Sequence, residues 1–393
     1  MPPESGLGVD DAVTRRPWDR RAPYLDRAAG TLLGAAVAVC LVGAPPAMAV
    51  ELAYPEGDSV GPSQLAWLVT MAVRHLDDPA GLAGQIGSAP ERTWTLALRA
   101  TVAEGRVPPA DLSLPHGPAL VGWRSVLETP VPRLDPARGV FPCSQLVAAI
   151  WSAHARGGDE AAMYAGALAG ARWGASGIGH GPQRRLADVL PPRRLVATAL
   201  GADPNTEPGD WPHLPSLAMP EAERPRNPAF HVPHPYDPGV VLCDMEYART
   251  SGAAEAVVSL CRMGNDDIPA HLADRDGVQV WLHDRPGANP NLHFVLDDAA
   301  RTVAALRAEG KRVLLHCWAC QSRTPAVAAH YAALTRRADV REALRTIIRA
   351  VGGHLRNPEL ARAVAALNGV RMEDPARVLF PDGAPEVTRM PPG

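Results

Sequence analysis

Two cysteines, Cys317 and Cys320, lie in the segment HCWACQSRT and are the residues best suited to chemistry. An apolar run precedes them and a helical pattern follows, which is also the layout of a thioredoxin-like dithiol. Two features favour a different chemistry: a histidine directly before Cys317, and Arg323 six residues after it. The helix is moreover predicted to start at Thr324 and Pro325, because proline favours the first turn of a helix, and not at the second cysteine.

The same segment can be interpreted as a cradle for an anion. A strand is predicted to end at His316, and a short loop and a helix N-terminus follow. Main-chain N–H groups and the positive end of the helix dipole would then face one point. Arg323 adds a planar guanidinium that can bind two phosphate oxygens at once. Such surroundings would stabilise the thiolate of Cys317 and make it a nucleophile for phosphorus.

The spacing of His316, Cys317, Arg323 and Thr324 resembles the signature of the cysteine-dependent tyrosine and dual-specificity phosphatases, and so does its strand–loop–helix context. The resemblance covers residues 240–335. It implies that Cys317 attacks phosphate to form a phosphocysteine, that Arg323 binds the phosphoryl oxygens and that Thr324 stabilises the departing thiolate. It also implies a phosphate-binding loop made of Trp318, Ala319, Cys320, Gln321, Ser322 and Arg323.

The same family uses an aspartic acid on an upstream loop to protonate the leaving group. Asp284 follows a predicted strand in a loop rich in Gly, Pro and Asn, and it lies 33 positions before Cys317. The resemblance therefore assigns the general acid to Asp284, which must be protonated to serve a leaving alkoxide or phenoxide. Asp297 and Asp298 are poorer candidates, because they are predicted to lie in the first turn of a helix.

One residue departs from the family pattern, because Cys320 stands where these phosphatases usually have glycine. A side chain there would strain the loop if the position requires a positive φ. A second thiol beside the nucleophile could also resolve a sulfenic acid of Cys317 into a disulfide, which makes Cys320 a candidate redox partner. Two alternatives therefore remain open: a thiol–disulfide oxidoreductase that uses both cysteines, and a non-catalytic module that binds phosphate or ADP-ribose.

Residues 25–200 are predicted to be mostly helical. Residues 63–76 have one apolar face, and the Ala- and Gly-rich residues 161–176 suit closely packed helices. Residues 26–39 and 166–181 resemble the opening helix and a late helix of the ADP-ribosylglycohydrolases. That family holds two magnesium ions with clusters of carboxylates and threonines.

The corresponding positions of this chain lack most of those ligands. The run Gly61-Pro62-Ser63 has no carboxylate, and the run Gly157-Gly158-Asp159-Glu160 keeps one matching aspartate, Asp159. Glu56 and Asp58 are near in sequence but out of register. Because a two-metal cage needs more hard oxygen ligands than these, we predict a degenerate, non-hydrolytic domain without metal. It could still bind an ADP-ribosyl group, and residual ADP-ribosyl hydrolysis is the alternative.

The N-terminal stretch imitates a secretory signal, with arginines, an apolar run and the sequence Ala47-Met48-Ala49. Asp19 and Asp26 interrupt the arginines, and Gly34 and Gly43 interrupt the apolar run. The run is also short for a membrane span. We therefore predict a buried helix that opens the helical domain, and a cytoplasmic protein.

The length of the chain predicts two domains. The predicted divisions are a disordered tail at 1–23, the helical domain at 24–200, a linker with ten prolines at 201–239, a phosphatase-like domain at 240–370 and a tail at 371–393. The prolines are expected to exclude regular structure from the linker. In the phosphatase-like domain, short strands at 240–242, 256–260, 278–282 and 312–315 alternate with a helix at 296–310. Such alternation predicts an α/β fold with a central, mostly parallel sheet flanked by helices.

The composition is that of an ordinary soluble globular protein, with 46% hydrophobic and 21% charged residues among 393. A net charge of −3 gives no reason to expect nucleic acid or an acidic membrane as a partner. We expect no cofactor, and a phosphorylated protein or a small phosphoester as the substrate. Six cysteines in a chain of this length do not make a disulfide scaffold, so we predict that Cys40, Cys143, Cys243 and Cys261 are buried, reduced thiols.

Overall fold

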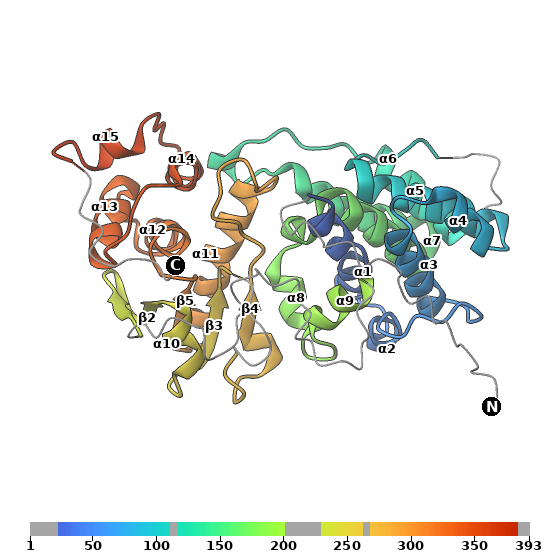
Figure 1. The fold of residues 1–393 in the computed structure, drawn as a ribbon, viewed down its shortest axis with the longest axis horizontal. Coiled ribbons are helices and arrows are strands. Elements are labelled where there is room, and N and C mark those ends of the chain that lie inside the picture. The colour runs from blue at the N-terminus through green and yellow to red at the C-terminus, as the bar shows by residue number, and fades with distance from the viewer. Residues whose placement is uncertain (1–22, 111–116, 201–228, 262–267, 384–393) are drawn as a thin grey trace, which may run out of the picture.

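The structure, a computed structural model, describes residues 23–110, 117–200, 229–261 and 268–383. Helices make up most of the described residues between positions 23 and 200, called here the helical half (Figure 1). A mixed sheet and further helices occupy residues 229–383, called here the α/β half. This agrees with the fold classes predicted for the two regions.

The elements have the following bounds. The helical half contains α1 (Pro23–Val42), α2 (Pro46–Glu51), α3 (Pro62–Arg74), α4 (Pro79–Gln85), α5 (Ala89–Glu104), α6 (Pro118–Glu128), α7 (Gln145–Trp173), α8 (His180–Leu186) and α9 (Pro192–Ala199). The α/β half contains β1 (His231–His234), β2 (Asp237–Cys243), α10 (Met245–Thr250), β3 (Ala256–Ser259), β4 (Gly277–Gln279), α11 (Leu292–Ala308), β5 (Val313–His316), α12 (Arg323–Arg336), α13 (Val340–Ala350), α14 (Pro358–Leu367) and α15 (Pro375–Leu379).

Helices α1 and α7 cross so closely that glycine is needed at the contact. A Cβ atom on Gly30 would overlap the carbonyl oxygen of Gly170, and one on Gly34 would overlap that of Gly166. On each helix the two glycines are four positions apart, so they lie on the same face and let the two backbones meet. The close packing predicted for the small residues of this stretch is therefore confirmed.

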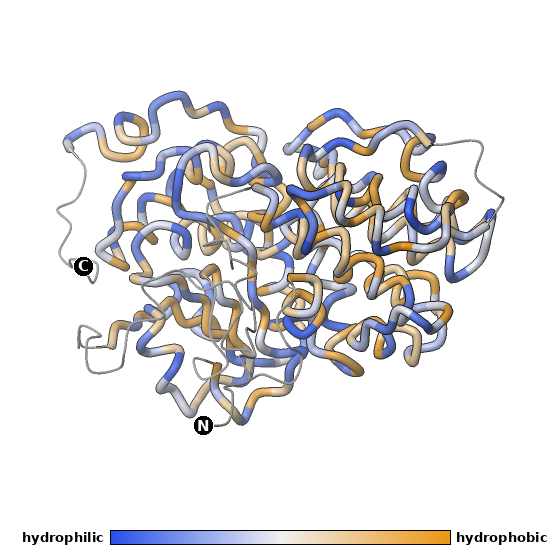
Figure 2. Tube along the Cα trace, turned by 45° about the vertical axis from the view of Figure 1, so that its right-hand side comes forward, coloured by the Kyte–Doolittle hydropathy of each residue, from blue (hydrophilic) through white to orange (hydrophobic). Residues whose placement is uncertain are grey.

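Helix α1 is a core helix of the helical half. Within the described part of the chain, its residues Tyr24–Val42 form the one helix that is long and apolar enough to cross a membrane. In the structure, 78% of its most apolar window is buried, which is typical of a helix inside a globular core. Figure 2 shows apolar segments running through both halves of the molecule.

The sheet has five strands in the order β1-β2-β5-β3-β4. Strands β2, β5, β3 and β4 run parallel, and β1 is an antiparallel edge strand on β2. The register places Cys243 of β2 and Ser259 of β3 on either side of His316, the last residue of β5. The carboxyl ends of three parallel strands therefore meet where the predicted anion cradle begins, at the edge where open parallel sheets bind ligands.

The two faces of the sheet are covered unequally. Successive side chains of a strand point to opposite faces. Val240 and Leu242 of β2 therefore join the large core beneath α11 and α12, whereas Cys243 joins a small cluster on the other face. The short helix α10 contributes Ala248 to that small cluster. The long helices that flank the cradle therefore lie on one side of the sheet.

Two predicted boundaries are wrong. The predicted linker contains β1 and the start of β2, because strands occupy residues 231–234 and 237–243. Prolines are tolerated there, since β1 is an edge strand and Pro238 lies at the start of β2. The predicted C-terminal tail contains α15, where Arg345 of α13 donates to the carbonyl oxygen of Leu379 at 2.8 Å. The remainder of the predicted linker and tails, residues 1–22, 201–228 and 384–393, lies outside the described residues.

Helix α11 begins at Leu292, earlier than the predicted start at 296. Asp297 and Asp298 therefore lie in its second turn, and the prediction that they sit in the first turn is wrong. Asp297 accepts from His330 at 3.0 Å and from Arg301 at 2.7 Å. Asp298 pairs with His180 of the helical half. Both carboxylates are thus engaged in ion pairs.

The pair between His180 and Asp298 connects the two halves. Nδ1 of His180 faces Asp298 Oδ2, and Nε2 lies 3.1 Å from the main-chain oxygen of Gln279. Both partners are hydrogen-bond acceptors, so the geometry favours a proton on each ring nitrogen. Burial alone would lower the pKa of His180, but the Asp298 carboxylate and the two hydrogen bonds raise it above its ordinary value.

Candidate active site

The loop of residues 317–322 connects the carboxyl end of β5 to the N-terminus of α12. His316 precedes it and is fully buried, with Nε2 2.7 Å from Ser259 Oγ on the neighbouring strand. Its Nδ1 is 3.3 Å from the carbonyl oxygen of Cys317. These contacts hold the imidazole between β3 and the first peptide of the loop, so the loop leaves the sheet in a defined direction.

The loop turns main-chain carbonyls toward the surrounding scaffold. The Trp318 oxygen accepts from the N–H of Met245 at 3.2 Å, and the Gln321 oxygen accepts from the N–H of His354 at 3.0 Å. In a trans peptide the N–H of the following residue points the opposite way. The two corresponding N–H groups are therefore directed away from α10 and from the connection between α13 and α14. An anion cradle needs N–H groups that turn away from the scaffold in this manner.

Arg323 begins α12 and is 6% exposed. Its Nη1 donates to the main-chain oxygens of Leu260 and Leu282, at 2.8 and 3.2 Å, which holds the guanidinium in one place. Burial alone would lower the pKa of Arg323, but Cys317 and the neighbouring acidic groups raise it above its ordinary value. A charged guanidinium thus lies beside the sulfur of Cys317.

Two buried polar atoms near Cys317 have no hydrogen-bond partner among the described residues. They are Arg323 Nε and Thr324 Oγ1. Thr324 is 0% exposed and Cys317 is 2% exposed. Buried donors in native proteins are nearly always paired, so these two groups are suited to form hydrogen bonds with a group bound in the loop. An oxyanion seated in the loop would accept from the guanidinium Nε.

Asp284 lies at the rim of this loop. Its Oδ1 accepts from Ser322 Oγ at 2.8 Å and from Asn357 Nδ2 at 3.3 Å. Its Oδ2 is 4.0 Å from Arg323 Nε, and the Asp284 side chain is 30% exposed. The carboxyl group thus lies between solvent and the buried Cys317 and Arg323. The structure brings together the four residues that the sequence predicts as catalytic: Cys317, Arg323, Asp284 and Thr324.

Asn357, which contacts Asp284, was not predicted from the sequence as a site residue. An asparagine before Pro358 at the start of α14 indicates a helix N-cap. Its side chain caps no main-chain N–H of that helix and donates to Asp284 instead. The two residues are 73 positions apart, so only the tertiary structure could reveal the contact.

Cys320 has a φ of 59°, in the left-handed region that favours glycine. Its side chain is fully buried beneath the loop. The strain predicted for a position that requires positive φ is therefore present at Cys320.

Replacing Cys320 by glycine is expected to give a protein about 1 kcal/mol more stable than replacing it by alanine. Both variants lose the thiol, but only glycine removes the penalty of a Cβ atom at positive φ. Urea unfolding of the two variants measures the difference, and equal stabilities would mean that residue 320 does not hold this φ in solution. If Cys320 resolves a sulfenic acid of Cys317, both variants should also fail to recover with dithiothreitol after mild peroxide treatment.

None of the six cysteines, all of which lie in the described ranges, forms a disulfide. Cys143, Cys243 and Cys261 are buried as predicted, whereas Cys40 is only half-buried. Burial raises the pKa of Cys143 to about 12 and that of Cys243 well above its ordinary value. These two thiols are therefore poor nucleophiles.

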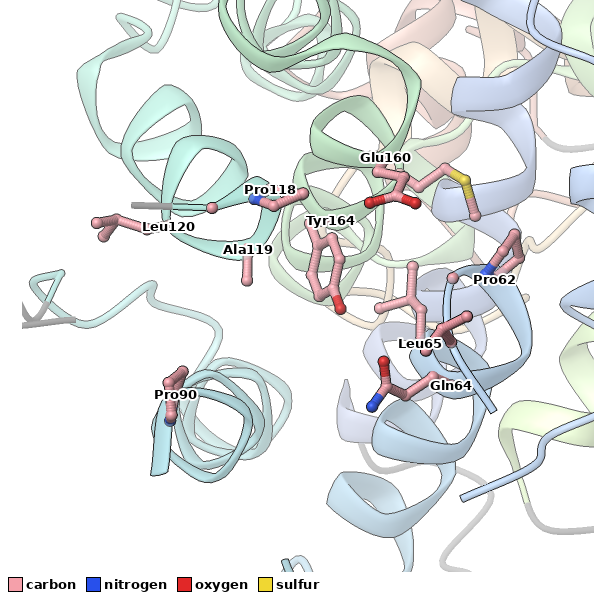
Figure 3. Close-up of a pocket in the computed structure, with 13 residues that line it drawn as sticks. Pro62, Gln64, Leu65, Pro90, Pro118, Ala119, Leu120, Glu160 and Tyr164 are labelled. Carbon is pink, nitrogen blue, oxygen red and sulfur yellow. The ribbon is translucent and has the colours of Figure 1, made fainter. Parts of the chain in front are cut away.

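The helical half contains a cavity of about 320 Å³ where the two runs that resemble metal-binding runs meet (Figure 3). Pro62 and Leu65 lie on one side and Pro118 on the other, and the Glu160 carboxylate and the Tyr164 ring project between them. Helices α3, α5 and α6 all begin beside this cavity, and none of the three has a side-chain hydrogen bond at its N-cap. Their first main-chain N–H groups therefore need water or a ligand as a partner.

The residue predicted as a vestigial metal ligand, Asp159, is not part of the cavity lining, which contains its neighbour Glu160. The Asp159 carboxylate is 3.2 Å from His154 Nδ1. Ser63 Oγ donates to the main-chain oxygen of Glu51 at 3.4 Å. In the described ranges, no group of three or more His, Cys, Asp and Glu side chains could hold a metal ion.

No protein-family model, curated protein or solved structure matches this chain. A functional assignment therefore depends on the geometry of the loop after β5 and on the resemblance of its motif.

Proposed function

We propose that the α/β half is a phosphoester hydrolase that acts through a phosphocysteine intermediate. The observation that carries the proposal is the pair of orphaned polar atoms, Arg323 Nε and Thr324 Oγ1, buried beside Cys317 with Asp284 at the rim. A cradle with unsatisfied donors, a charged guanidinium, a nucleophile and an acid is the set of groups that phosphoryl transfer through cysteine requires.

The proposed reaction has two displacements at phosphorus. In the first, the Cys317 sulfur forms a bond to phosphorus while the bond to the leaving oxygen breaks, and Asp284 gives that oxygen its proton. In the second, a water molecule attacks the phosphocysteine, Asp284 takes a proton from the water and the sulfur departs as a thiolate. Arg323 and the loop N–H groups bind the phosphoryl oxygens in both steps. Thr324 Oγ1 would donate to the departing thiolate.

Two residues favour this reaction over thiol–disulfide exchange. Arg323 places a charged guanidinium beside Cys317, and Asp284 lies at the rim of the loop. Neither residue would have a role in dithiol chemistry. The proposed substrate is a phosphorylated protein or a small phosphoester. We also propose a cytoplasmic protein that needs no cofactor for this reaction.

Purified full-length protein should hydrolyse an aryl phosphate over a range of pH values, and it should not reduce the disulfides of insulin in the presence of dithiothreitol. Insulin reduction without phosphate release would instead support the oxidoreductase. If the protein binds inorganic phosphate but releases none from the aryl ester, the non-catalytic binding module would be correct.

A second candidate function concerns the helical half. We propose that its cavity binds an ADP-ribosyl group without hydrolysing it, because several helix N-termini meet there and their N–H groups can bind phosphate. Calorimetry of the full-length protein with ADP-ribose is expected to show saturable binding that is independent of magnesium. A Tyr164→Ala variant should weaken this binding, and the Asp159→Asn variant, altered outside the cavity lining, is the control. No saturable binding, or binding that requires magnesium, would contradict the proposal.

A further inference from the structure

The loop that carries Asp284 contacts the helical half at both of its ends. This acid loop, residues 281–291, connects β4 to α11. At its first residue, Trp281 is 7% exposed and belongs to the apolar core cluster of the helical half, not to that of the α/β half. Three positions separate Trp281 from Asp284, so the strand end that leads to the acid is anchored in the neighbouring core.

The other end of the acid loop is held by a series of hydrogen bonds in which each donor side chain leads toward the Asp26 carboxylate. Nδ2 of Asn291 donates to the main-chain oxygen of Trp173 at 2.7 Å and to Ser176 Oγ at 2.8 Å. Ser176 in turn donates to the Asp26 carboxylate through its hydroxyl and its main-chain N–H. Asn291, Ser176 and Asp26 are all buried. A carboxylate on α1 thus orients the amide at the end of the acid loop.

Apolar side chains of the helical half also enter the core of the α/β half. Phe141 and Cys143 of the helical half belong to the core cluster of the α/β half. The Phe141 ring contacts the edge of Phe294, in the first turn of α11, with ring centroids 5.6 Å apart. Each half therefore places aromatic side chains in the core of the other, on either side of the acid loop.

Within the acid loop, two hydrogen bonds connect the segment before Asn291 to the residue next to Asp284. Asn289 accepts from the main-chain N–H of His283 at 2.8 Å and donates to the His283 oxygen at 2.9 Å. The residue next to Asp284 is therefore tied to a residue two positions before Asn291. If Asn291 moved, the hydrogen bonds between Asn289 and His283 would therefore shift the Asp284 carboxyl group as well.

We propose that the helical half positions the general acid, and that Asn291 is the positioning residue through which it acts. The inference depends on the proposed phosphoesterase function and adds a role for the helical half in it. A general acid must stand within hydrogen-bond reach of the leaving oxygen, and a shift of about 1 Å can cost a large factor in rate. Phosphate binding by the cradle needs no such reach, so it should not depend on the helical half.

The experiment compares two substrates in steady-state kinetics of the full-length protein. Phenyl phosphate needs a proton on its leaving oxygen, whereas 2,4-dinitrophenyl phosphate does not. The Asn291→Ala variant is expected to lower kcat/KM for phenyl phosphate by about tenfold and kcat/KM for the dinitrophenyl ester by less than about twofold, because kcat/KM reports the steps up to departure of the leaving group and not the later hydrolysis of the phosphocysteine. Ser176→Ala removes one of the two acceptors of the Asn291 amide and leaves the Trp173 oxygen in place, so it should give a smaller shift of the same kind. Hydrogen exchange at the His283 amide should become faster in both variants.

The matched control is Arg193→Ala, which breaks an ion pair between the halves, from Arg193 to Asp274 at 3.0 Å, away from the acid loop. It should leave the ratio of the two kcat/KM values unchanged. An equal loss for both substrates, no loss for either, or an altered ratio in Arg193→Ala would overturn the inference while the phosphoesterase function stands. If the wild-type protein hydrolyses neither ester, the proposed function fails and this inference fails with it.

Discussion

A Cys317→Ser variant is expected to lose aryl phosphate hydrolysis by more than about a thousandfold, because a serine hydroxyl is far less acidic than a thiol and cannot supply the anionic nucleophile. The cradle itself should survive the change. Arg323 keeps its hydrogen bonds to Leu260 and Leu282, and the loop carbonyls keep theirs to the scaffold. The variant should therefore still bind phosphate or vanadate with an affinity close to that of the wild type.

Two measurements test this expectation. Initial rates with an aryl phosphate give the loss of turnover, and calorimetry with inorganic phosphate gives the retained binding. Cys40→Ser, which removes a half-buried thiol on α1, is the control and should keep full activity. Turnover of the serine variant at the wild-type rate would exclude Cys317 as the nucleophile. Loss of phosphate binding together with turnover would indicate a collapsed loop, which the control variant would not share.

An Asp284→Asn variant should hydrolyse phenyl phosphate about a hundredfold more slowly than the wild type, or slower still, which is the usual loss on removal of a general acid. The two side chains have the same shape, and the carboxamide oxygen can still accept from Ser322 and Asn357. Both of those hydrogen bonds fall on Oδ1, so Oδ2 is the oxygen that can carry the transferable proton. The amide has no such proton to give.

The loss should shrink for esters whose leaving group is stable without a proton. A plot of log kcat/KM against the leaving-group pKa should therefore be steeper for Asp284→Asn than for the wild type. Glu359→Gln is the control, because Glu359 contacts the same loop through the N–H of Gly287 at 2.7 Å and a carboxamide can still accept there. Its rates should stay within about twofold of the wild type. An equal loss of Asp284→Asn with every leaving group would assign Asp284 a role other than proton transfer.

Much of the candidate site could be predicted from the sequence because its parts are local. Nine consecutive residues, 316–324, contain the end of a strand, a loop and the start of a helix, and their spacing alone indicates a nucleophile with an arginine beside it. The close packing predicted for residues 161–176 is equally local, since four-residue spacing places small residues on one helix face. The strain at Cys320 follows from the same local chemistry.

The residues that surround the loop of residues 317–322 could be identified only in the tertiary structure. Asn357 and Asp284 meet across 73 positions, and Asn291 meets Ser176 across 115, so no local pattern contains either contact. Asparagine ahead of a helix favours an N-cap, but the Asn357 side chain donates to the acid and caps no main-chain N–H of α14. The prolines of residues 231–239 were expected to prevent strands, yet β1 forms because an edge strand leaves one side of its backbone unpaired.

The sequence by itself predicted the residues of the candidate site, a helical region followed by an α/β region, and the suitability of residues 161–176 for close helix packing. Each of these depends on side-chain type and on spacing along a few turns of chain. Only the tertiary structure decided that the acid loop is anchored in the helical half and that Glu160, not Asp159, faces the cavity. The physical reason is that such contacts depend on how distant surfaces pack together. Burial and hydrogen-bond satisfaction select among the many pairings that the polar residues of one chain could make.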